Sequence, residues 1–229
     1  MNETTTVQSN RDTRPRTAAI VAGIGLLVMA VIAAFSNFGV IQSLTVSGDP
    51  GATAMNLIDS AARFRLGAVG LLIVAALDVV VAWGLYVALR SVNPSLSLLG
   101  AWFRLAYAGI FAMVINNLFS ALHAAPMDPN QTFFLIESFN DGWQIGLVFF
   151  GLHLGIVGAL LWRRTGIFAR IVAVLVIIAA VGYLVDGLGT VLSQNYSLEL
   201  GRFTFVGEVV LIFWLLIRGG KVREAGSRS

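Results

Sequence analysis

The chain contains no cysteine, only two histidines and few charged residues for its 229 residues. The absence of cysteine excludes disulfides and thiolate metal sites, and it leaves the redox compartment undetermined. Charged residues make up 12% of the chain, about half of what a soluble domain carries. The sequence also lacks a His-Glu-x-x-His zinc helix, a Gly-x-Ser-x-Gly turn and a phosphate-binding glycine loop. No metal site is predicted, and the sequence leaves any cofactor unknown.

Six apolar runs fill the sequence instead, and hydrophobic residues account for 57% of the chain. The runs cover residues 18–41, 66–89, 101–122, 143–162, 171–192 and 203–217. Most are long enough for a helix to cross a hydrocarbon core about 30 Å thick, which takes about 20 residues. The sequence therefore predicts an all-α, multi-pass bundle of six transmembrane helices in residues 17–218, embedded in the cell membrane. Residues 1–16 and 219–229 are predicted to be tails, the first of them disordered.

Basic residues are concentrated at alternate ends of these runs. Arg63, Arg65 and Arg202 lie at one set of ends, and the other twelve of the 15 basic residues lie at the opposite set. Arg104 is counted among those twelve as an interfacial residue. Because cytoplasmic loops carry the excess of Lys and Arg, both termini are predicted to be cytoplasmic. This arrangement accounts for the net charge of +3 by topology, so no nucleic-acid partner is predicted.

Two outer loops contain apolar residues. In the first, residues 42–65, Met55, Ile58 and Ala62 follow a turn at helical spacing, which predicts a short helix lying on the membrane interface. In the other, residues 124–142, an apolar patch at 133–136 is too short to span a membrane. We interpret this segment as a loop whose patch rests on lipid headgroups or covers something beneath it.

Several segments resemble a known family. They are FRLG (64–67), LYVALR (85–90), AWFRL (101–105), GLVFFGLHL (146–154) and GYLVD (182–186). Together they make residues 18–219 similar to an uncharacterised family of bacterial six-span membrane proteins, known as domain of unknown function 4386. The resemblance implies a six-helix architecture and a prokaryotic membrane. It supplies no catalytic residues.

Polar residues inside the runs are the candidate functional groups, because ionisable side chains are costly in lipid. Asp186 and Glu208 each lie about six residues, roughly 9 Å, from the outer ends of neighbouring runs, so we expect them to face each other and share a proton or hold a cation. Asp78 and His153 lie near the middle of their runs and would form the floor of the same outward-facing pocket. The predicted ligand-binding residues are Asp78, Asn116, Asn117, His153, Tyr183, Asp186 and Glu208.

Each of these residues also has a structural interpretation. Asn116 and Asn117 can serve as hydrogen-bond partners between helices, and His153 can be a core histidine whose nitrogens are satisfied. The leading hypothesis is a membrane protein that binds or transports a cation, a protonatable small molecule or a lipid headgroup. The alternatives are an intramembrane enzyme acting on a lipid or prenyl substrate through Asp78 and His153, and a structural partner of another membrane protein. The sequence leaves open whether the chain is an enzyme and whether it forms a homo-oligomer in the lipid bilayer.

Overall fold

The computed structural model describes residues 14–193, 196, 198, 200–201 and 205–218. The predicted tail at 219–229 and nearly all of the tail at 1–16 lie outside these residues. Within the described part the chain is helical and contains no strand. The elements are α1 (Pro15–Ala34), the π-helix η1 (Phe35–Ile41), α2 (Gln42–Leu44), α3 (Pro50–Asp59), α4 (Ala61–Leu89), α5 (Pro94–Ala124), α6 (Pro129–Trp162), α7 (Ile167–Leu192) and α9 (Val206–Ile217).

Three of the helices begin with the same local device, an acidic or amide side chain followed by proline. The side chain of Asp49 accepts from the amide of Ala52 at the start of α3, and Asn93 accepts from Leu96 at the start of α5. Asp128 accepts from two amides at the start of α6. The side chain satisfies an amide that has no partner inside the helix, and proline at the first helical position has no amide to satisfy. The sequence therefore fixes these helix starts locally.

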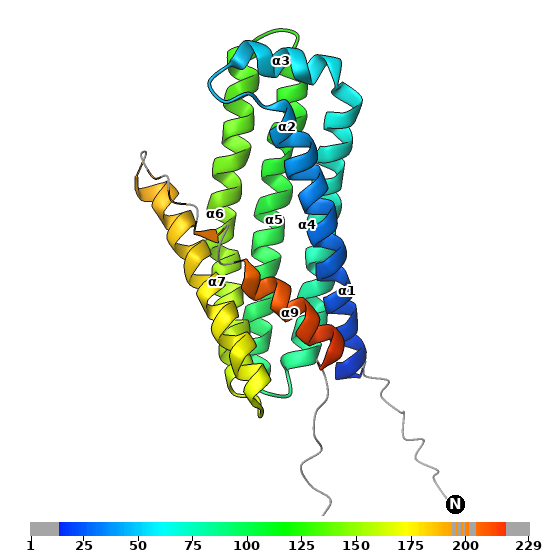
Figure 1. The fold of residues 1–229 in the computed structure, drawn as a ribbon, viewed down its shortest axis with the longest axis vertical. Helices are drawn as coiled ribbons and strands as arrows, with labels where there is room; N and C mark the ends of the chain where they lie inside the picture. Colours follow the sequence, from blue (N-terminus) through cyan, green and yellow to red (C-terminus); the bar gives the residue numbers. More distant parts are fainter. Residues whose placement is uncertain (1–13, 194–195, 197, 199, 202–204, 219–229) are drawn as a thin grey trace, which may run out of the picture.

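The long helices form an elongated bundle in which sequence neighbours lie side by side (Figure 1). α4 packs against α1 and α5, and α6 packs against α5 and α7. α9 packs against both α7 and α1, so six helices surround a common interior in one half of the bundle. In the other half α7 leans away from the rest, and α3 covers the ends of the long helices there (Figure 1).

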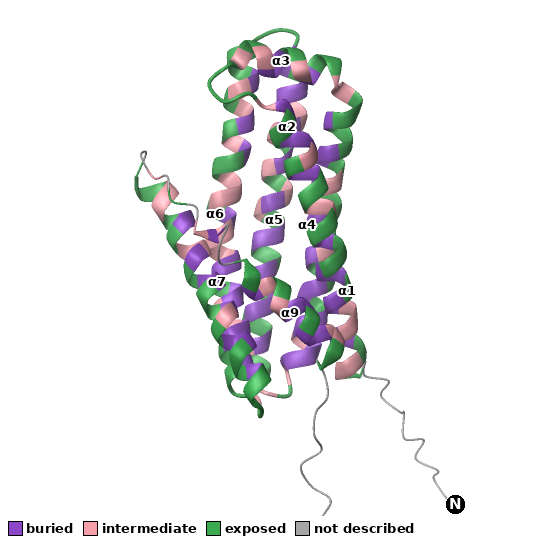
Figure 2. Ribbon diagram, viewed as in Figure 1, coloured by how far each residue is buried: buried purple, intermediate pink, exposed green. Residues whose placement is uncertain are grey.

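Five helical stretches are long and apolar enough to cross a membrane: Pro15–Leu44, Ala61–Leu89, Pro94–Ala124, Pro129–Trp162 and Ile167–Leu192. Only 39–50% of each apolar window is buried inside the protein, so much of the remaining apolar surface faces outward, as Figure 2 shows. A sixth helix, α9, has 12 residues and is about 18 Å long, and the start of the sixth apolar run lies outside the described residues. A full sixth crossing and the cytoplasmic position of the termini therefore stay predictions.

The interpretation of residues 124–142 as a loop is wrong. α5 continues to Ala124 and α6 begins at Pro129, so the connection is only a few residues long. The apolar patch at 133–136 lies in the first turns of α6, where Ile136 is buried. Asp128 caps this helix, and no proline or glycine interrupts it before Gly142, so the chain continues as one helix of 34 residues.

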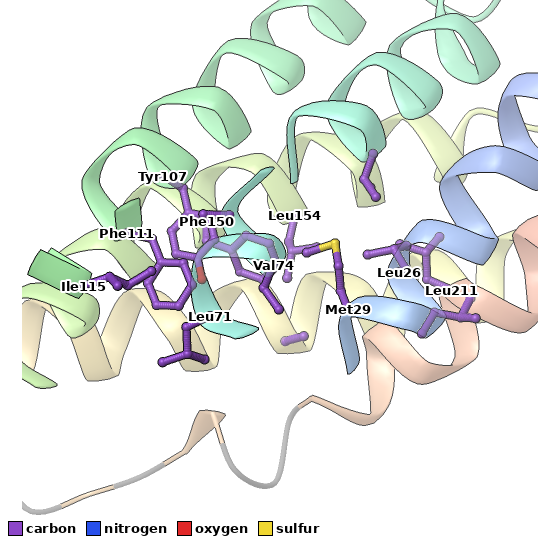
Figure 3. Packing of buried hydrophobic residues seen from close by; sticks show 14 of the residues in the cluster. Leu26, Met29, Leu71, Val74, Tyr107, Phe111, Ile115, Phe150, Leu154 and Leu211 are labelled. Atoms are coloured by element: carbon purple, nitrogen blue, oxygen red, sulfur yellow. The ribbon is translucent and has the colours of Figure 1, made fainter. Parts of the chain in front are cut away.

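The core lies between the helices and is formed largely by aromatic and branched side chains (Figure 3). The ring of Tyr107 lies 4.9 Å from that of Phe150 and 5.7 Å from that of Phe111. These apolar residues surround the polar groups described next, and they set the low dielectric in which those groups interact.

A candidate buried charge cluster

An ion pair joins α4 and α5 in the bundle interior. Nη2 of Arg104 lies 2.6 Å from Oδ1 of Asp78, and each side chain is 1% exposed. The contact is a close ion pair whose angles are not those of a hydrogen bond, and Oδ2 of Asp78 and Nε of Arg104 are buried without a hydrogen-bond partner among the described residues. Burial of a charged group is unfavourable unless an opposite charge lies beside it, so Asp78 and Arg104 each offset the cost of burying the other.

Arg104 also contacts α6. Its Nη1 lies 3.2 Å from Nε2 of His153, and Nδ1 of the same histidine lies 2.8 Å from the carbonyl oxygen of Gly100. Because a guanidinium can only donate, Nε2 accepts and Nδ1 carries the proton that it donates to Gly100. The guanidinium carbon lies 5.2 Å from the centroid of the Phe150 ring, a cation–π contact. Both ring nitrogens of His153 are thus engaged within the protein.

A second carboxyl group reaches this region from α9. The hydroxyl of Tyr183 on α7 donates to Oε1 of Glu208 at 2.5 Å. Glu208 lies close enough to Arg104 to be attracted by it and close enough to Asp78 to be repelled. We call Asp78, Arg104, His153, Tyr183 and Glu208 the charge cluster. Five different helices contribute to it, α4, α5, α6, α7 and α9.

Asp186 has a different role from the one expected. It accepts from the hydroxyl of Tyr196 at 2.6 Å and from the backbone amides of Leu200 and Gly201 at 3.0 and 2.6 Å. The bond to Asp186 raises the pKa of the Tyr196 phenol to about 12. Asp186 thus binds Tyr196, Leu200 and Gly201, which precede α9 in the chain, while Tyr183, one turn earlier on the same face of α7, binds Glu208. The two acids predicted to face each other form hydrogen bonds with separate partners.

Neither of the two predicted asparagines takes part in the hydrogen bonds of the charge cluster among the described residues. Asn116 is exposed on α5 and Asn117 is half-buried, and no hydrogen bond of either side chain is found among the described residues. Ligand binding by these residues stays a prediction.

A small cavity adjoins His153. It lies between α4, α5 and α6, toward the ends where α4 stops and α5 begins, and Leu85, Ser97, Gly100 and Val157 are among its lining residues. It leaves room for about one water molecule. Gly100 keeps this space open, since a Cβ atom there would lie 3.1 Å from Ile156. The cavity lies on the side of the cluster toward the connection between α4 and α5, so the predicted outward-facing opening stays a prediction.

Arg104 is the member of the charge cluster that the sequence analysis placed incorrectly. It was expected at the interface, yet it lies in the interior. Asp78 is 11 residues before the end of α4 and Arg104 is ten residues after the start of α5. In an antiparallel pair of helices both positions lie about 15–17 Å from the same end. This match in depth was the signal available in the sequence.

Among the described residues, no three His, Cys, Asp or Glu side chains are grouped closely enough to hold a metal ion. With His153 engaged at both nitrogens and Asp78 paired with Arg104, the cluster is an electrostatic network built from two carboxyl groups and one guanidinium. Such a network can hold, release or exchange a positive charge.

Comparison with known proteins agrees with the fold and leaves the activity open. The chain is similar to an uncharacterised protein of Archaeoglobus fulgidus, with 33% identity over 159 residues that cover 69% of this chain and 87% of the relative. No solved structure matches the chain. The family model described as "Domain of unknown function (DUF4386)" matches residues 21–219. The apolar helices and this match together identify the chain as a member of that family, whose architecture is that of an integral membrane protein.

Proposed function

We propose that the charge cluster takes up and releases a proton, or a small cation in its place, while the protein binds or transports a protonatable small molecule or lipid headgroup. The observation that carries the proposal is the buried ion pair of Asp78 with Arg104, with a second carboxyl group, that of Glu208 on α9, within electrostatic range of both. The predicted outward opening is part of the proposal, because Tyr183 and then Asp186 continue from Glu208 toward the outer end of α7.

The charges of the cluster do not balance when all its groups are ionised. Asp78 and Glu208 would contribute two negative charges, and Arg104 contributes one positive charge. His153 contributes none in the tautomer that its contacts require. Asp78 is buried and Glu208 is half-buried. An uncompensated negative charge with so little access to solvent is unfavourable, and one proton or one small cation removes it.

The tight packing favours a very small ligand at this position. The space beside His153 accepts about one water molecule, and Phe150 covers one face of the guanidinium. Tyr183 donates its only hydroxyl proton to Glu208, so a proton added to Glu208 goes to its second oxygen or displaces this bond. Binding of a proton at Glu208 would therefore change the contact between α7 and the start of α9.

The proposal is tested by infrared difference spectroscopy of the purified protein in lipid nanodiscs during acidification. A protonated carboxyl group has a C=O stretch that shifts in heavy water, and we expect such a band from the wild-type protein. Glu208→Gln should remove or shift it, and Asp78→Asn should move the pH at which it develops. Glu137→Gln is the matched control, because Glu137 is exposed on α6 far along the chain from the cluster.

A band that is identical in the wild type, Glu208→Gln and Asp78→Asn would refute the proposal. In that case the cluster would serve only to hold the helices together, as the structural alternative in the sequence analysis expects. No specific contact among the described residues favours the enzymatic alternative.

A further inference from the structure

We propose that the arginine-rich end of the bundle binds the phosphate headgroup of an anionic phospholipid. This inference is independent of the proton proposal, because it concerns the opposite region of the same helices. The end in question is where α1, α5 and α7 begin and α4, α6 and α9 stop. Its described arginines are Arg14, Arg16, Arg90, Arg163, Arg164, Arg170 and Arg218.

No acidic side chain among the described residues pairs with Arg164, Arg170 or Arg218. The described acids lie either in the bundle interior or toward the other end: Asp49, Asp59, Asp78, Asp128, Glu137, Asp141, Asp186 and Glu208. Like charges gathered in one place repel, and they attract any anion that can reach them. Arg164, Arg170 and Arg218 therefore favour the binding of an anion at this end of the bundle.

Three arginines are held in place by aromatic rings. The guanidinium carbon of Arg218 lies 4.7 Å from the ring centroid of Phe168, and that of Arg164 lies 5.4 Å from the ring centroid of Trp214. Arg170 lies 6.0 Å from the ring centroid of Trp162. A guanidinium whose face rests on a ring still presents N–H groups at its edge, in the fork geometry that suits a phosphate.

All three arginines lie at the same end of the bundle, and two of the contacts join α9 to the region where α6 ends and α7 begins. Phe168 and Arg170 lie in the first turn of α7, Arg164 lies in the connection before it, and Arg218 ends α9. Arg164 is also anchored by a 2.7 Å hydrogen bond to the carbonyl oxygen of Ala88, and burial lowers the pKa of its guanidinium. We call Arg164, Arg170 and Arg218 the headgroup site.

Exposed apolar side chains adjoin the headgroup site. They lie on the last turn of α6, the first turns of α7 and the end of α9: Trp162, Ile167, Phe168, Ile171, Phe213 and Ile217, each 48–68% exposed. A free phosphate would leave this apolar surface uncovered, whereas the acyl chains of a phospholipid would cover it. Basic residues at helix ends beside an apolar face are typical of sites that recognise anionic lipids. The combination of a phosphate-binding arginine group and an apolar border favours a lipid over a soluble anion.

The test compares lipid binding to the full-length protein in nanodiscs of phosphatidylcholine with and without phosphatidylglycerol, read by native mass spectrometry after release. We expect the wild type to retain phosphatidylglycerol preferentially. Arg170→Gln combined with Arg218→Gln should weaken this retention about thirtyfold, because each arginine near an anionic membrane surface contributes about a factor of five. Arg65→Gln, at the exposed outer end of α4, is the matched control and should leave retention unchanged.

Two results would overturn the inference. One is equal retention of both lipids by the wild-type protein, which requires no variant and therefore does not depend on whether a variant folds. The other is full displacement of phosphatidylglycerol by millimolar-range inorganic phosphate, which would identify a site for the free anion. A change in the carboxyl infrared band would bear on the charge cluster alone, so the two proposals can fail separately.

Discussion

Removal of Arg104 should destabilise the protein more than any other single change in the charge cluster. Two unit charges about 4 Å apart attract by about 4 kcal/mol at an effective dielectric constant of 20. Removing one partner of a buried pair costs about 3–5 kcal/mol, because the other charge is left in the interior. With its atoms 2.6 Å from Asp78 and both side chains 1% exposed, Arg104 falls in this class. We expect Arg104→Gln to lower the free energy of unfolding by about 3–5 kcal/mol.

The structure also predicts an order among the variants. Arg104→Gln leaves two carboxyl groups without a cation, whereas Asp78→Asn leaves Arg104 with Glu208 still in range. Asp78→Asn should therefore be the milder of the two. The double variant should recover part of the loss, since replacing both partners of a buried ion pair by neutral groups of similar shape is often close to neutral. We expect a coupling energy of about 2–3 kcal/mol, at the upper end for residues in contact.

The free energy of unfolding can be measured from SDS titrations in mixed micelles, with helix content followed by circular dichroism. Arg65→Gln and Glu137→Gln, both exposed and away from the cluster, are the controls and should change stability by less than about 0.5 kcal/mol. Additive effects of Asp78→Asn and Arg104→Gln would show that the two side chains do not depend on each other, and the account of the cluster given above would then be incorrect.

Three further predictions follow from packing and topology. Gly207→Ala should be strongly destabilising, because its Cβ would lie 2.3 Å from the backbone carbonyl oxygen of Leu175. Gly109→Ala, whose Cβ would meet nothing within 4 Å, should instead stabilise α5 by up to about 1 kcal/mol. Thermal unfolding in detergent would distinguish the two variants, and equal effects would contradict the close approach of Gly207 to Leu175. Asp186→Asn keeps one acceptor oxygen where the carboxylate serves three donors, so the free energy of unfolding should fall by about 1–3 kcal/mol and hydrogen exchange of the Leu200 and Gly201 amides should accelerate. Unchanged protection of these two amides would argue against this role of Asp186. Since the chain has no native cysteine, Met127→Cys should react with a membrane-impermeant maleimide on intact cells and Thr165→Cys only after permeabilisation, and the reverse result would invert the predicted topology.

Much of the helical architecture follows from local features of the sequence. Runs of apolar residues long enough to span a membrane and proline-preceded caps such as Asp128 act within one segment, so a reader of the sequence can recognise them. The extension of α6 through residues 133–136 was missed because the polar residues around the patch resemble a loop. The length of an apolar run and the length of the helix that contains it differ when the helix projects beyond the apolar layer.

The sequence alone determined that the chain is a helical membrane protein with acids, amides and a histidine inside apolar segments, because hydrophobic length and composition are local properties. Only the tertiary structure decided which of these groups meet. The pairing of Asp78 with Arg104, the engagement of both His153 nitrogens and the separate partners of Asp186 and Glu208 depend on which face each helix turns inward. Rotation of a helix about its axis is set by its contacts with neighbouring helices, and no single segment encodes those contacts by itself.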